Sequence, residues 1–399
     1  MLENLIGAES ETCNGLGRWL AREALERRDL KTLFSAFCNE LRRRDLPLWR
    51  GQLGLEVLHP EQVGIMLVWK DDNLTVRDAQ RSEVMQSPDY TNSPTRIVDE
   101  TNETFRRRLD RPSPDIPLLE DLRQSGATDY VMIPLPFLEK RRTAVVSFAT
   151  QMPDGFTERQ IDDLKLAALL FSPYAERHVL RRLAVDLLDI YIGPRSGERI
   201  TDGQIELGQV EHIQAAIWLA DMRGFTRFSE EASIADVIQG LNSWLKPMVA
   251  VIENHGGEVL KFIGDAVLAI FPIMGDEKGI QDTCGRALSA AREFGTTAVQ
   301  INEARRMEGL PPLDYGLVLH VGEVAYGNIG APTRLDFTVI GPAVNRAARL
   351  QELTKQLGQR LLVSETFADT CSCKLMDLGH HVLRDIDGEQ RIFAVDETE

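Results

Sequence analysis

The spacing of hydrophobic residues predicts a first group of elements between residues 15 and 150. One apolar stripe at helical spacing predicts a helix over about 15–45. Its members are Leu16, Trp19, Leu20 and Ala24. Three apolar runs predict strands at 63–70, 130–137 and 143–150. The stretch from about 82 to 117 is rich in Pro, Ser, Asn and Arg, and it therefore predicts loops and short helices.

A long helix is predicted next, over about 157–192. Thr157 with Gln160 three residues later forms a capping box, which marks a helix start. Apolar residues with 3-4-3 spacing follow on both sides of Pro173: Ile161, Leu164, Ala168 and Phe171, then Leu180, Leu183, Leu187 and Ile190. This spacing suits the seam of a parallel two-stranded coil, and it equally suits an amphipathic helix packed on its own domain.

The pattern changes after a turn-rich stretch at 193–210, which lacks a helical stripe and is interpreted as a connector. The run IQAAIWLAD predicts a strand that ends at Asp221, and a helix is predicted at 233–254. The run EVLKFIGDAVLAIF predicts two strands joined at Gly264 and Asp265. These strands are apolar enough to be neighbours in the centre of a sheet. We therefore expect the two aspartates to lie side by side.

Such a pair of carboxylates points to a metal site. Two carboxylates placed together repel each other unless a cation lies between them. Mg²⁺ prefers a few carboxylates together with water and substrate phosphates. The turn Gly224-Phe225-Thr226 opens a helix directly after the first strand, and its N–H groups suit phosphate oxygens. The alternative is structural, with Asp221 as a helix cap and Asp265 as a turn residue; it is weakened because each aspartate ends a hydrophobic strand.

Composition narrows the class of protein. The formal net charge of −16 argues against a general nucleic-acid binder, which needs a basic face. No window approaches 18 uninterrupted apolar residues, and the N-terminus lacks the regions of a signal peptide, so we expect a cytoplasmic protein without a membrane span. The five cysteines lack the spacing of a disulfide framework and predict reduced thiols. Cys371 and Cys373 alone do not make a metal site, because no second pair stands at ligand spacing.

Four segments resemble, in order, the motif blocks of class III nucleotidyl cyclases: LADMRGFTRFS, GGEVLKFIGDAVLAIF, LHVGEVAYGNIG and DFTVIGPAVNRAARL. The resemblance covers essentially all of 213–395 and implies a catalytic domain over 211–399. The implied fold is α+β and ferredoxin-like (palm-like), with a mainly antiparallel sheet and helices on one face. The implied activity is that of an adenylate cyclase, which converts ATP to 3′,5′-cyclic AMP and pyrophosphate.

The resemblance also implies roles for individual residues. Asp221 and Asp265 would bind two Mg²⁺ or Mn²⁺ ions per active site, assisted by the Met222 carbonyl. Asn345 and Arg349 stand four apart on one helix and so face one side. By resemblance, Asn345 positions the ribose and Arg349 stabilises charge that grows on the α-phosphate.

The choice of base depends on Lys261 and Thr338. This pair resembles the class IIIb subgroup, which uses it to read adenine, whereas guanine-specific relatives typically carry glutamate and cysteine. ATP is therefore favoured over GTP. Strand alternation alone also allows Lys261 to point at water. By the same resemblance, Arg384 is the candidate for a basic residue that meets the terminal phosphates.

In this family the two aspartates come from one chain and the other four residues from a second chain. This chain carries both sets, so we expect a homodimer with two equivalent sites, and the helix at 161–190 is favoured as the dimer seam. A diguanylate cyclase is disfavoured, because the glycine pair reads Gly256-Gly257-Glu258-Val259 and lacks that family's signature. An inactive scaffold is disfavoured by the complete set of six residues.

The first part of the chain resembles a GAF-like sensor domain, most clearly in the segment PLPFLEKRRTAVVSFATQMPDGFTERQIDDLKLAALL. Its regulator is expected to be a small molecule or a protein of unknown identity. His59 and His178 are interpreted as ordinary polar residues. The expected domains are an α/β GAF-like regulatory domain at 1–156, a helical dimerisation linker at 157–192, a connector at 193–210 and the catalytic domain at 211–399.

Overall fold

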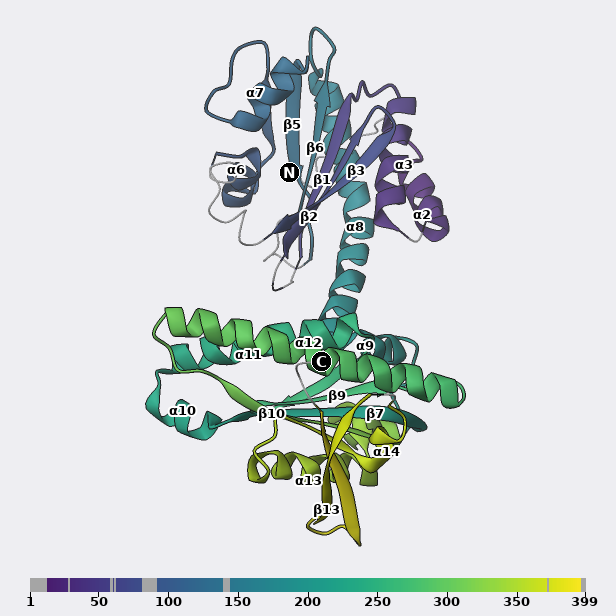
Figure 1. Cartoon of the computed structure of the whole chain (residues 1–399). Helices are drawn as coiled ribbons and strands as arrows, with labels where there is room; N and C mark the ends of the chain where they lie inside the picture. Colours follow the sequence, from purple (N-terminus) through teal and green to yellow (C-terminus); the bar gives the residue numbers. More distant parts are fainter. Residues whose placement is uncertain are drawn as a thin grey trace. The chain divides into compact units, whose positions relative to one another are not determined.

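The computed structural model describes residues 13–27, 29–57, 60, 62–80, 92–138, 144–371 and 373–395. The chain divides into two compact units, and the division falls between Leu187 and Leu188. We call them unit 1 and unit 2 and describe each by itself (Figure 1). Within the described ranges, every helix is too short or too polar to cross a membrane.

Unit 1 is built on a six-stranded sheet with the order β3-β2-β1-β6-β5-β4. Its strands are β1 (Arg50–Glu56), β2 (Gln62–Lys70), β3 (Asn73–Gln80), β4 (Phe105–Arg108), β5 (Asp129–Pro134) and β6 (Ala144–Thr150). Its helices are α2 (Leu16–Glu26), α3 (Leu30–Arg43), α6 (Pro94–Thr101), α7 (Pro117–Gln124) and the long α8 (Glu158–Ile192), whose last residues belong to unit 2.

Helices cover both faces of this sheet (Figure 1). On one face α2, α3 and α8 enclose a core in which Phe37 stacks on Phe171, with ring centroids 4.4 Å apart. On the other face α6 and α7 pack over Tyr130 and Met132 of β5. Val131 between them belongs to the first core, because successive side chains of a strand point to opposite faces. Both faces of the sheet therefore contribute to the stability of unit 1.

The hydrophobic pattern predicted β2, β5 and β6 but missed the other three strands. β4 lies in the stretch predicted as loops and helices, since its sequence FRRR shows no alternation. Instead, Arg106 of β4 donates to the buried Asp129 Oδ2 at 2.8 Å. The α/β expectation is corrected to α+β, because all described strand pairs are antiparallel. His59 and residues 81–91 lie outside the described residues.

Helix α8 begins with the predicted capping box and continues through Pro173. The Thr157 N–H donates to Gln160 Oε1 at 3.0 Å, and the Gln160 N–H donates to Thr157 Oγ1 at 3.2 Å, which confirms the box. The first apolar stripe is buried in the core of unit 1 and cannot serve as a dimer seam, which corrects that part of the expectation. Its members are Ile161, Leu164, Ala168 and Phe171.

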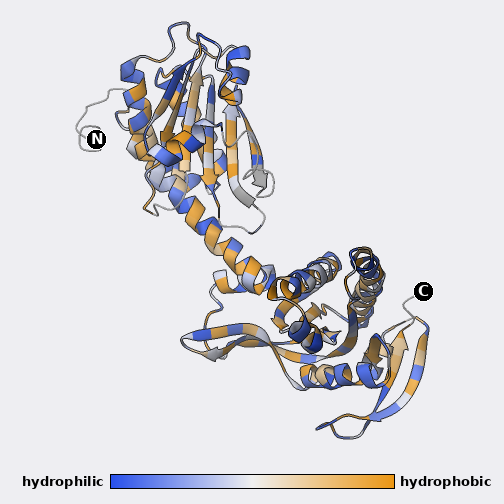
Figure 2. Ribbon diagram, turned by 90° about the vertical axis from the view of Figure 1, so that its left-hand side faces the viewer, coloured by the Kyte–Doolittle hydropathy of each residue, from blue (hydrophilic) through white to orange (hydrophobic). Residues whose placement is uncertain are grey.

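The second stripe of α8 stays open. Leu180, Leu187 and Ile190 are 46%, 37% and 40% exposed. Figure 2 shows hydrophobic residues recurring along this part of the helix. The two interpretations of the helix therefore apply to different halves, since the first half packs on its own unit and the second half keeps an apolar stripe accessible.

Unit 2 is built on an eight-stranded sheet with the order β13-β14-β12-β10-β7-β9-β8, and β11 pairs with β10. Its strands are β7 (Val210–Arg223), β8 (Glu258–Ile263), β9 (Ala266–Pro272), β10 (Asp314–Ala331), β11 (Arg334–Ile340), β12 (Leu361–Ser364), β13 (Leu375–Val382) and β14 (Glu389–Val395). Its helices are α9 (Pro194–Thr201), α10 (Phe225–Glu231), α11 (Ile234–Asn254), α12 (Glu277–Met307), α13 (Pro342–Gln356) and α14 (Glu365–Ala368). β10 and β12 pair in parallel and the other described pairs are antiparallel, as expected for a mainly antiparallel sheet.

Helices cover both faces of this sheet too, so the prediction of one covered face was wrong. Ala216 and Trp218 of β7 pack in a core with α11 and α12. Ala215 and Ile217 point the other way and pack in a core with α13. A strand buried on both faces reads as a continuous apolar run, as AAIWLA at 215–220 does. β8 is an edge strand, so β9 is the member of the predicted hairpin that lies beside β7.

The stretch interpreted as a turn-rich connector contains helix α9. Glu258 at the start of β8 is 3% exposed, and its Oε1 accepts from the Ser196 N–H at 3.0 Å and from Ser196 Oγ at 2.7 Å. The Tyr326 hydroxyl donates to the same carboxylate at 3.0 Å. Burial and the Glu258 charge raise the pKa of that hydroxyl. The helix was missed because polar contacts of this kind, and not an apolar stripe, hold it against the sheet.

A buried histidine links the stability of unit 2 to pH. His320 on β10 is 1% exposed, and its Nδ1 lies 2.8 Å from Ser364 Oγ. Burial lowers the pKa of His320 to about 4, with a smaller contribution from the charge on Arg346. Between about pH 6.5 and pH 4 the folded state therefore binds fewer protons than the unfolded state, and stability falls as the pH falls through this window.

We expect His320→Gln to flatten this pH dependence, because glutamine keeps a hydrogen-bonding side chain that does not titrate. Between pH 7 and pH 4.5, denaturant unfolding of the full chain should show the wild type losing on the order of 2–3 kcal/mol. The variant should lose clearly less. His380→Gln, at an exposed position of β13, should behave as the wild type. An equal loss in the His320 variant would assign the effect to other groups.

Candidate active site

The structure places the two predicted metal ligands side by side at one end of β7. Asp221 lies near the end of β7, and Asp265 lies in the turn between β8 and β9. The Met222 N–H donates to Asp265 Oδ2 at 3.2 Å. The Asp265 carboxyl also contacts the Asp221 carboxyl. An acidic pair, Asp221 and Asp265, is therefore formed within one chain.

The register of the sheet explains this arrangement. β9 pairs with β7 only as far as Ala220, whereas β10 pairs with it as far as Arg223. Beyond Ala220, the edge of β7 that faces β9 is no longer paired with that strand. The turn that carries Asp265 lies at this edge. Gly264 adopts a φ of 66°, which favours glycine, and so lets Asp265 meet this edge. The N–H and C=O of one strand residue leave on the same edge, so the Met222 carbonyl is directed there as well.

The electrostatics of the acidic pair favour a cation. Burial raises the pKa of Asp265, and contact with the Asp221 carboxylate raises it further, to about 6. Lys355 of α13 places its Nζ 3.3 Å from Asp221 Oδ2. One ammonium therefore lies beside two carboxylates, which leaves the pair able to bind further positive charge.

The predicted phosphate-binding turn follows directly after this pair. Gly224 has a φ of 75° and occupies the N-cap position of α10, and no side chain among the described residues caps that end. Phe225 packs against the core of unit 2, and Thr226 is exposed. The turn thus presents a helix N-terminus within a few residues of Asp221, where the helix dipole favours negative charge.

Lys261 lies on the face of the sheet that α13 covers. The pairing of β8 with β9 shifts register between Val259 and Lys261, and Lys261 stands opposite Leu268, which packs in the core with α13. The Lys261 ammonium forms an ion pair with Asp336 of β11, and its side chain is 29% exposed. The bulge and this ion pair, and not solvent, therefore fix the direction of the side chain.

Thr338 lies on β11 two residues from Asp336 and is 4% exposed. Its Oγ1 is buried and has no hydrogen-bond partner among the described residues. A buried hydroxyl without a partner is costly. A polar ligand atom that reached this oxygen would remove the cost, so Thr338 fits a binding role better than a packing role.

Asn345 and Arg349 lie one turn apart on α13. Asn345 is exposed. Arg349 Nη1 donates to Glu352 Oε1 at 2.7 Å, and Arg349 Nη2 lies 3.6 Å from Asp385 Oδ2. Arg384 Nη2 reaches the same Glu352 oxygen at 3.4 Å. The two arginines predicted to contact phosphates therefore lie together, held by two carboxylates of their own chain.

Within one chain, Thr338 and the acidic pair lie beside different parts of β10. Asp221 is paired with Gly316 of β10, and Thr338 is paired with Gly327 of the same strand. These two glycines are eleven residues apart. Thr338 therefore lies beside a different part of β10 from the acidic pair, although the Lys261–Asp336 ion pair brings β11 close to β8.

The helix α13 shows the same separation. Lys355, which contacts Asp221, is ten residues beyond Asn345. Ten residues of helix rise by about 15 Å. Asn345 therefore lies well away from the acidic pair of its own chain.

The sequence did not predict four charged side chains that hold these groups: Arg223, Asp336, Glu352 and Lys355. Asp336 and Arg223 stand two residues from Thr338 and Asp221, so closeness to a motif was the available signal. Glu352 and Lys355 follow Asn345 on the same helix. Glu352 pairs with Arg349 three residues away and also with the distant Arg384, and Lys355 pairs with the distant Asp221. No periodicity in the sequence indicates the distant partners.

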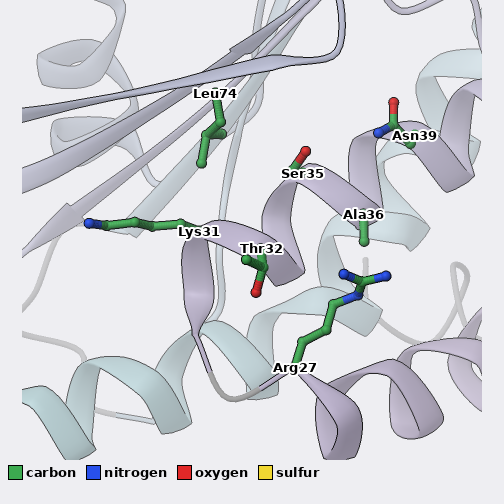
Figure 3. Close-up of a pocket in the computed structure, with 7 residues that line it drawn as sticks. All are labelled: Arg27, Lys31, Thr32, Ser35, Ala36, Asn39 and Leu74. Atoms are coloured by element: carbon green, nitrogen blue, oxygen red, sulfur yellow. The ribbon is translucent and has the colours of Figure 1, made fainter.

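Unit 1 carries a pocket of about 330 Å³ (Figure 3). It lies beside α3 and is lined by Arg27, Lys31, Thr32, Ser35, Ala36, Asn39 and Leu74. All of these residues belong to unit 1, so the pocket is distinct from the acidic pair. The five cysteines of the chain are free thiols in this structure.

Comparison with known proteins supports a nucleotidyl cyclase domain in unit 2. Residues 208–392, a little under half of the chain, match the adenylate and guanylate cyclase catalytic domain family. An adenylate cyclase of Anabaena cylindrica is 36% identical over 173 residues, which make up 42% of this chain and 33% of that protein. The chain spans about a third of the length of the curated relatives it matches.

Solved structures of both adenylyl and guanylyl cyclases are similar to this chain. The adenylyl cyclase CyaB from P. aeruginosa is 25% identical, with 47% of this chain and 96% of that chain covered and a TM-score of 0.41. The guanylyl cyclase Cya2 is 26% identical, with 47% and 93% covered and a TM-score of 0.41. The matched residues 208–392 contain the acidic pair and the group around Thr338 and Asn345. Most of unit 2 therefore matches the adenylate and guanylate cyclase catalytic domain family.

Proposed function

We propose that this protein is an adenylate cyclase, which converts ATP to 3′,5′-cyclic AMP and pyrophosphate at a homodimer interface under the control of unit 1. The observation that carries the proposal is the contact between Asp221 and Asp265 at the end of β7. Two carboxylates in contact gain most from a divalent cation. A divalent cation beside a helix N-terminus suits a triphosphate substrate.

The acidic pair fits Mg²⁺ or Mn²⁺, with two ions per site as proposed from the sequence. Asp221 and Asp265 offer carboxylate oxygens, and the Met222 carbonyl is directed to the same edge. Among the described residues, no group of three or more His, Cys, Asp or Glu side chains could hold a metal ion. An ion at the acidic pair would therefore take its remaining ligands from water and substrate phosphates, as Mg²⁺ prefers. Bound ions would supply Lewis-acid activation of the ribose 3′-hydroxyl and neutralise charge on the triphosphate.

The protein's own residues bind and orient the nucleotide. The N–H groups at 224–226 contact phosphate oxygens. Asn345 holds the ribose so that its 3′-oxygen faces the α-phosphate. Arg349 stabilises the negative charge that grows on this phosphate as the new bond to the 3′-oxygen forms and the bond to pyrophosphate breaks. Arg384 contacts the terminal phosphates, since it shares Glu352 with Arg349 and so lies in the same group.

Lys261 and Thr338 select adenine. The ring nitrogen of adenine accepts a hydrogen bond from the Lys261 ammonium, which the ion pair with Asp336 holds on the α13 face. Thr338 Oγ1 accepts from the amino group of adenine and so gains the partner it lacks among the described residues. Guanine presents the reverse order of donor and acceptor on this edge, so GTP is the poorer substrate.

The distance between Asn345 and the acidic pair of its own chain supports a homodimer. The acidic pair of one chain acts with Lys261, Thr338, Asn345 and Arg349 of a second copy, and twofold symmetry then creates two equivalent sites. The open stripe of α8, which includes Leu180 and Ile190, suits parallel pairing of the two linkers.

Unit 1 is proposed to regulate the cyclase as a GAF-like sensor, with the domain boundaries at 156, 192 and 210 retained from the sequence. The buried hydrogen bonds between α9 and β8 support this proposal. Ser196 of α9 is bonded to Glu258, which begins the strand that carries Lys261. A movement of α8 would be transmitted to α9, which follows it in the chain, and from α9 to β8 through these buried hydrogen bonds.

The first test is the reaction itself. The purified full-length protein with Mn²⁺ should form cyclic AMP from ATP and little cyclic GMP from GTP, measured by chromatography of the products. Asp265→Asn should lower the rate by at least about 100-fold, because the carboxylate charge is lost while the side chain can still accept from the Met222 N–H. Asp282→Asn, at an exposed position of α12, should keep wild-type activity. Cyclic GMP as the main product would contradict adenine selection, and no product from either nucleotide would contradict the proposal.

The shared site predicts complementation between two inactive variants. Asp265→Asn and Asn345→Ala should each abolish activity, and an equal mixture should recover about a quarter of the wild-type rate, since half of the dimers are mixed and each has one intact site. Product formation after mixing and re-equilibration measures this. Mixtures as inactive as either variant alone would show that the sites are not shared between chains.

Control by unit 1 predicts that its removal changes activity. A fragment that begins at residue 188 should form cyclic AMP at a rate clearly different from that of the full-length protein, assayed at equal dimer concentration. Equal rates for both proteins under every condition tested would count against regulation, while leaving the catalytic proposal intact.

A further inference from the structure

The end of α13 is anchored beside the acidic pair. Arg223, two residues after Asp221, donates through Nη2 to the carbonyl oxygens of Thr354 at 2.7 Å and Gln359 at 2.6 Å. Carbonyls at a helix C-terminus have no partner within the helix, so a guanidinium is a favourable partner for them. The last turn of α13 is thereby held at the end of β7.

A second set of contacts fixes the same turn. Gln351 Nε2 donates to the Gly316 carbonyl at 2.9 Å, and Thr354 is fully buried against Gly316, which leaves no room for a Cβ there. Gly316 is the strand partner of Asp221. The helix therefore approaches the sheet at the level of the acidic pair, and Lys355 projects from this fixed turn.

Lys355 contacts a proposed metal ligand directly. Its Nζ lies 3.3 Å from Asp221 Oδ2, and the two side chains are 55% and 24% exposed. An ion pair with this exposure is weak, so the ammonium can leave at low cost. Until it leaves, it occupies an oxygen that a divalent cation would use, and it repels that cation.

We propose that Lys355 is the resident counter-ion of the acidic pair, and that it competes with the divalent cation for Asp221 until substrate phosphates draw the ammonium away. The inference rests on the proposed function, since it assigns a way of controlling metal entry to the same site. Phosphate oxygens are strong partners for an ammonium group. Nucleotide arrival would then remove the competitor and add metal ligands at once, so the metal binds weakly before the nucleotide and tightly with it.

Binding of Mn²⁺ alone to the nucleotide-free, full-length protein tests the inference, with free Mn²⁺ measured by electron paramagnetic resonance. Lys355→Met should lower the Mn²⁺ dissociation constant roughly two- to five-fold, the effect expected of one exposed ion pair. Lys355→Arg keeps the charge and should keep the wild-type constant. Lys355 is more than half exposed, so these changes should not disturb folding, and circular dichroism checks this.

Lys278→Met is the matched control. Lys278 is an exposed residue at the start of α12, a few residues after β9 ends at Pro272. Pro272 pairs with Ala215, which is six residues and about 20 Å of strand from Asp221. This variant removes the same charge far from the acidic pair and should bind Mn²⁺ as the wild type does.

The following outcomes distinguish failure of the inference from failure of the proposed function. Equal constants for wild type and Lys355→Met, an equal tightening in Lys278→Met, or no Mn²⁺ binding by either protein would overturn the inference. If Asp265→Asn still abolishes cyclic AMP formation in that case, the proposed function stands. Formation of cyclic AMP that does not depend on Asp265 would instead overturn the proposed function.

Discussion

Repulsion between two neighbouring carboxylates is the constraint on which the candidate site of unit 2 depends. Asp221 and Asp265 are kept in contact because β7 is fixed on both edges, by β9 up to Ala220 and by β10 up to Arg223. Apolar cores on both faces of β7 provide the free energy that offsets the repulsion. Binding of a cation would relieve this repulsion, which is the physical reason for the metal site that we propose.

The acidic pair could be predicted from the sequence because the signal was local. Asp221 follows an apolar run within β7, Asp265 comes two residues after β8 ends, and the run before Asp221 is long enough to identify a buried strand. Helix α9 and strand β4 could not be predicted in this way. In α9, Ser196 is hydrogen-bonded to Glu258, which is 62 residues away. In β4, Arg106 is hydrogen-bonded to Asp129, which is 23 residues away. Polar contacts between distant residues leave no periodicity in the sequence.

The family resemblance identified positions but not their arrangement. It named Lys261, Arg349 and Arg384, yet the carboxylates that hold these cations, among them Asp336 and Glu352, became known only from the structure. It also implied helices on a single face of the sheet, whereas the unbroken run at 215–220 indicates burial on both faces. Resemblance therefore gave the positions of candidate residues, whereas their contacts and the packing of the sheet came from the structure.

The division of α8 into a buried half and an open half bears on how the protein assembles. The open stripe from Leu180 to Ile190 spans about three helical turns, too few heptads for a stable coiled coil. In the proposed homodimer, most of the affinity between subunits would then come from unit 2, where the nucleotide would bridge two chains. A ligand that binds only the dimer shifts the monomer–dimer equilibrium by mass action. In dilute solution the nucleotide would then promote assembly of the proposed homodimer, and the proposed activity would rise more steeply than the protein concentration.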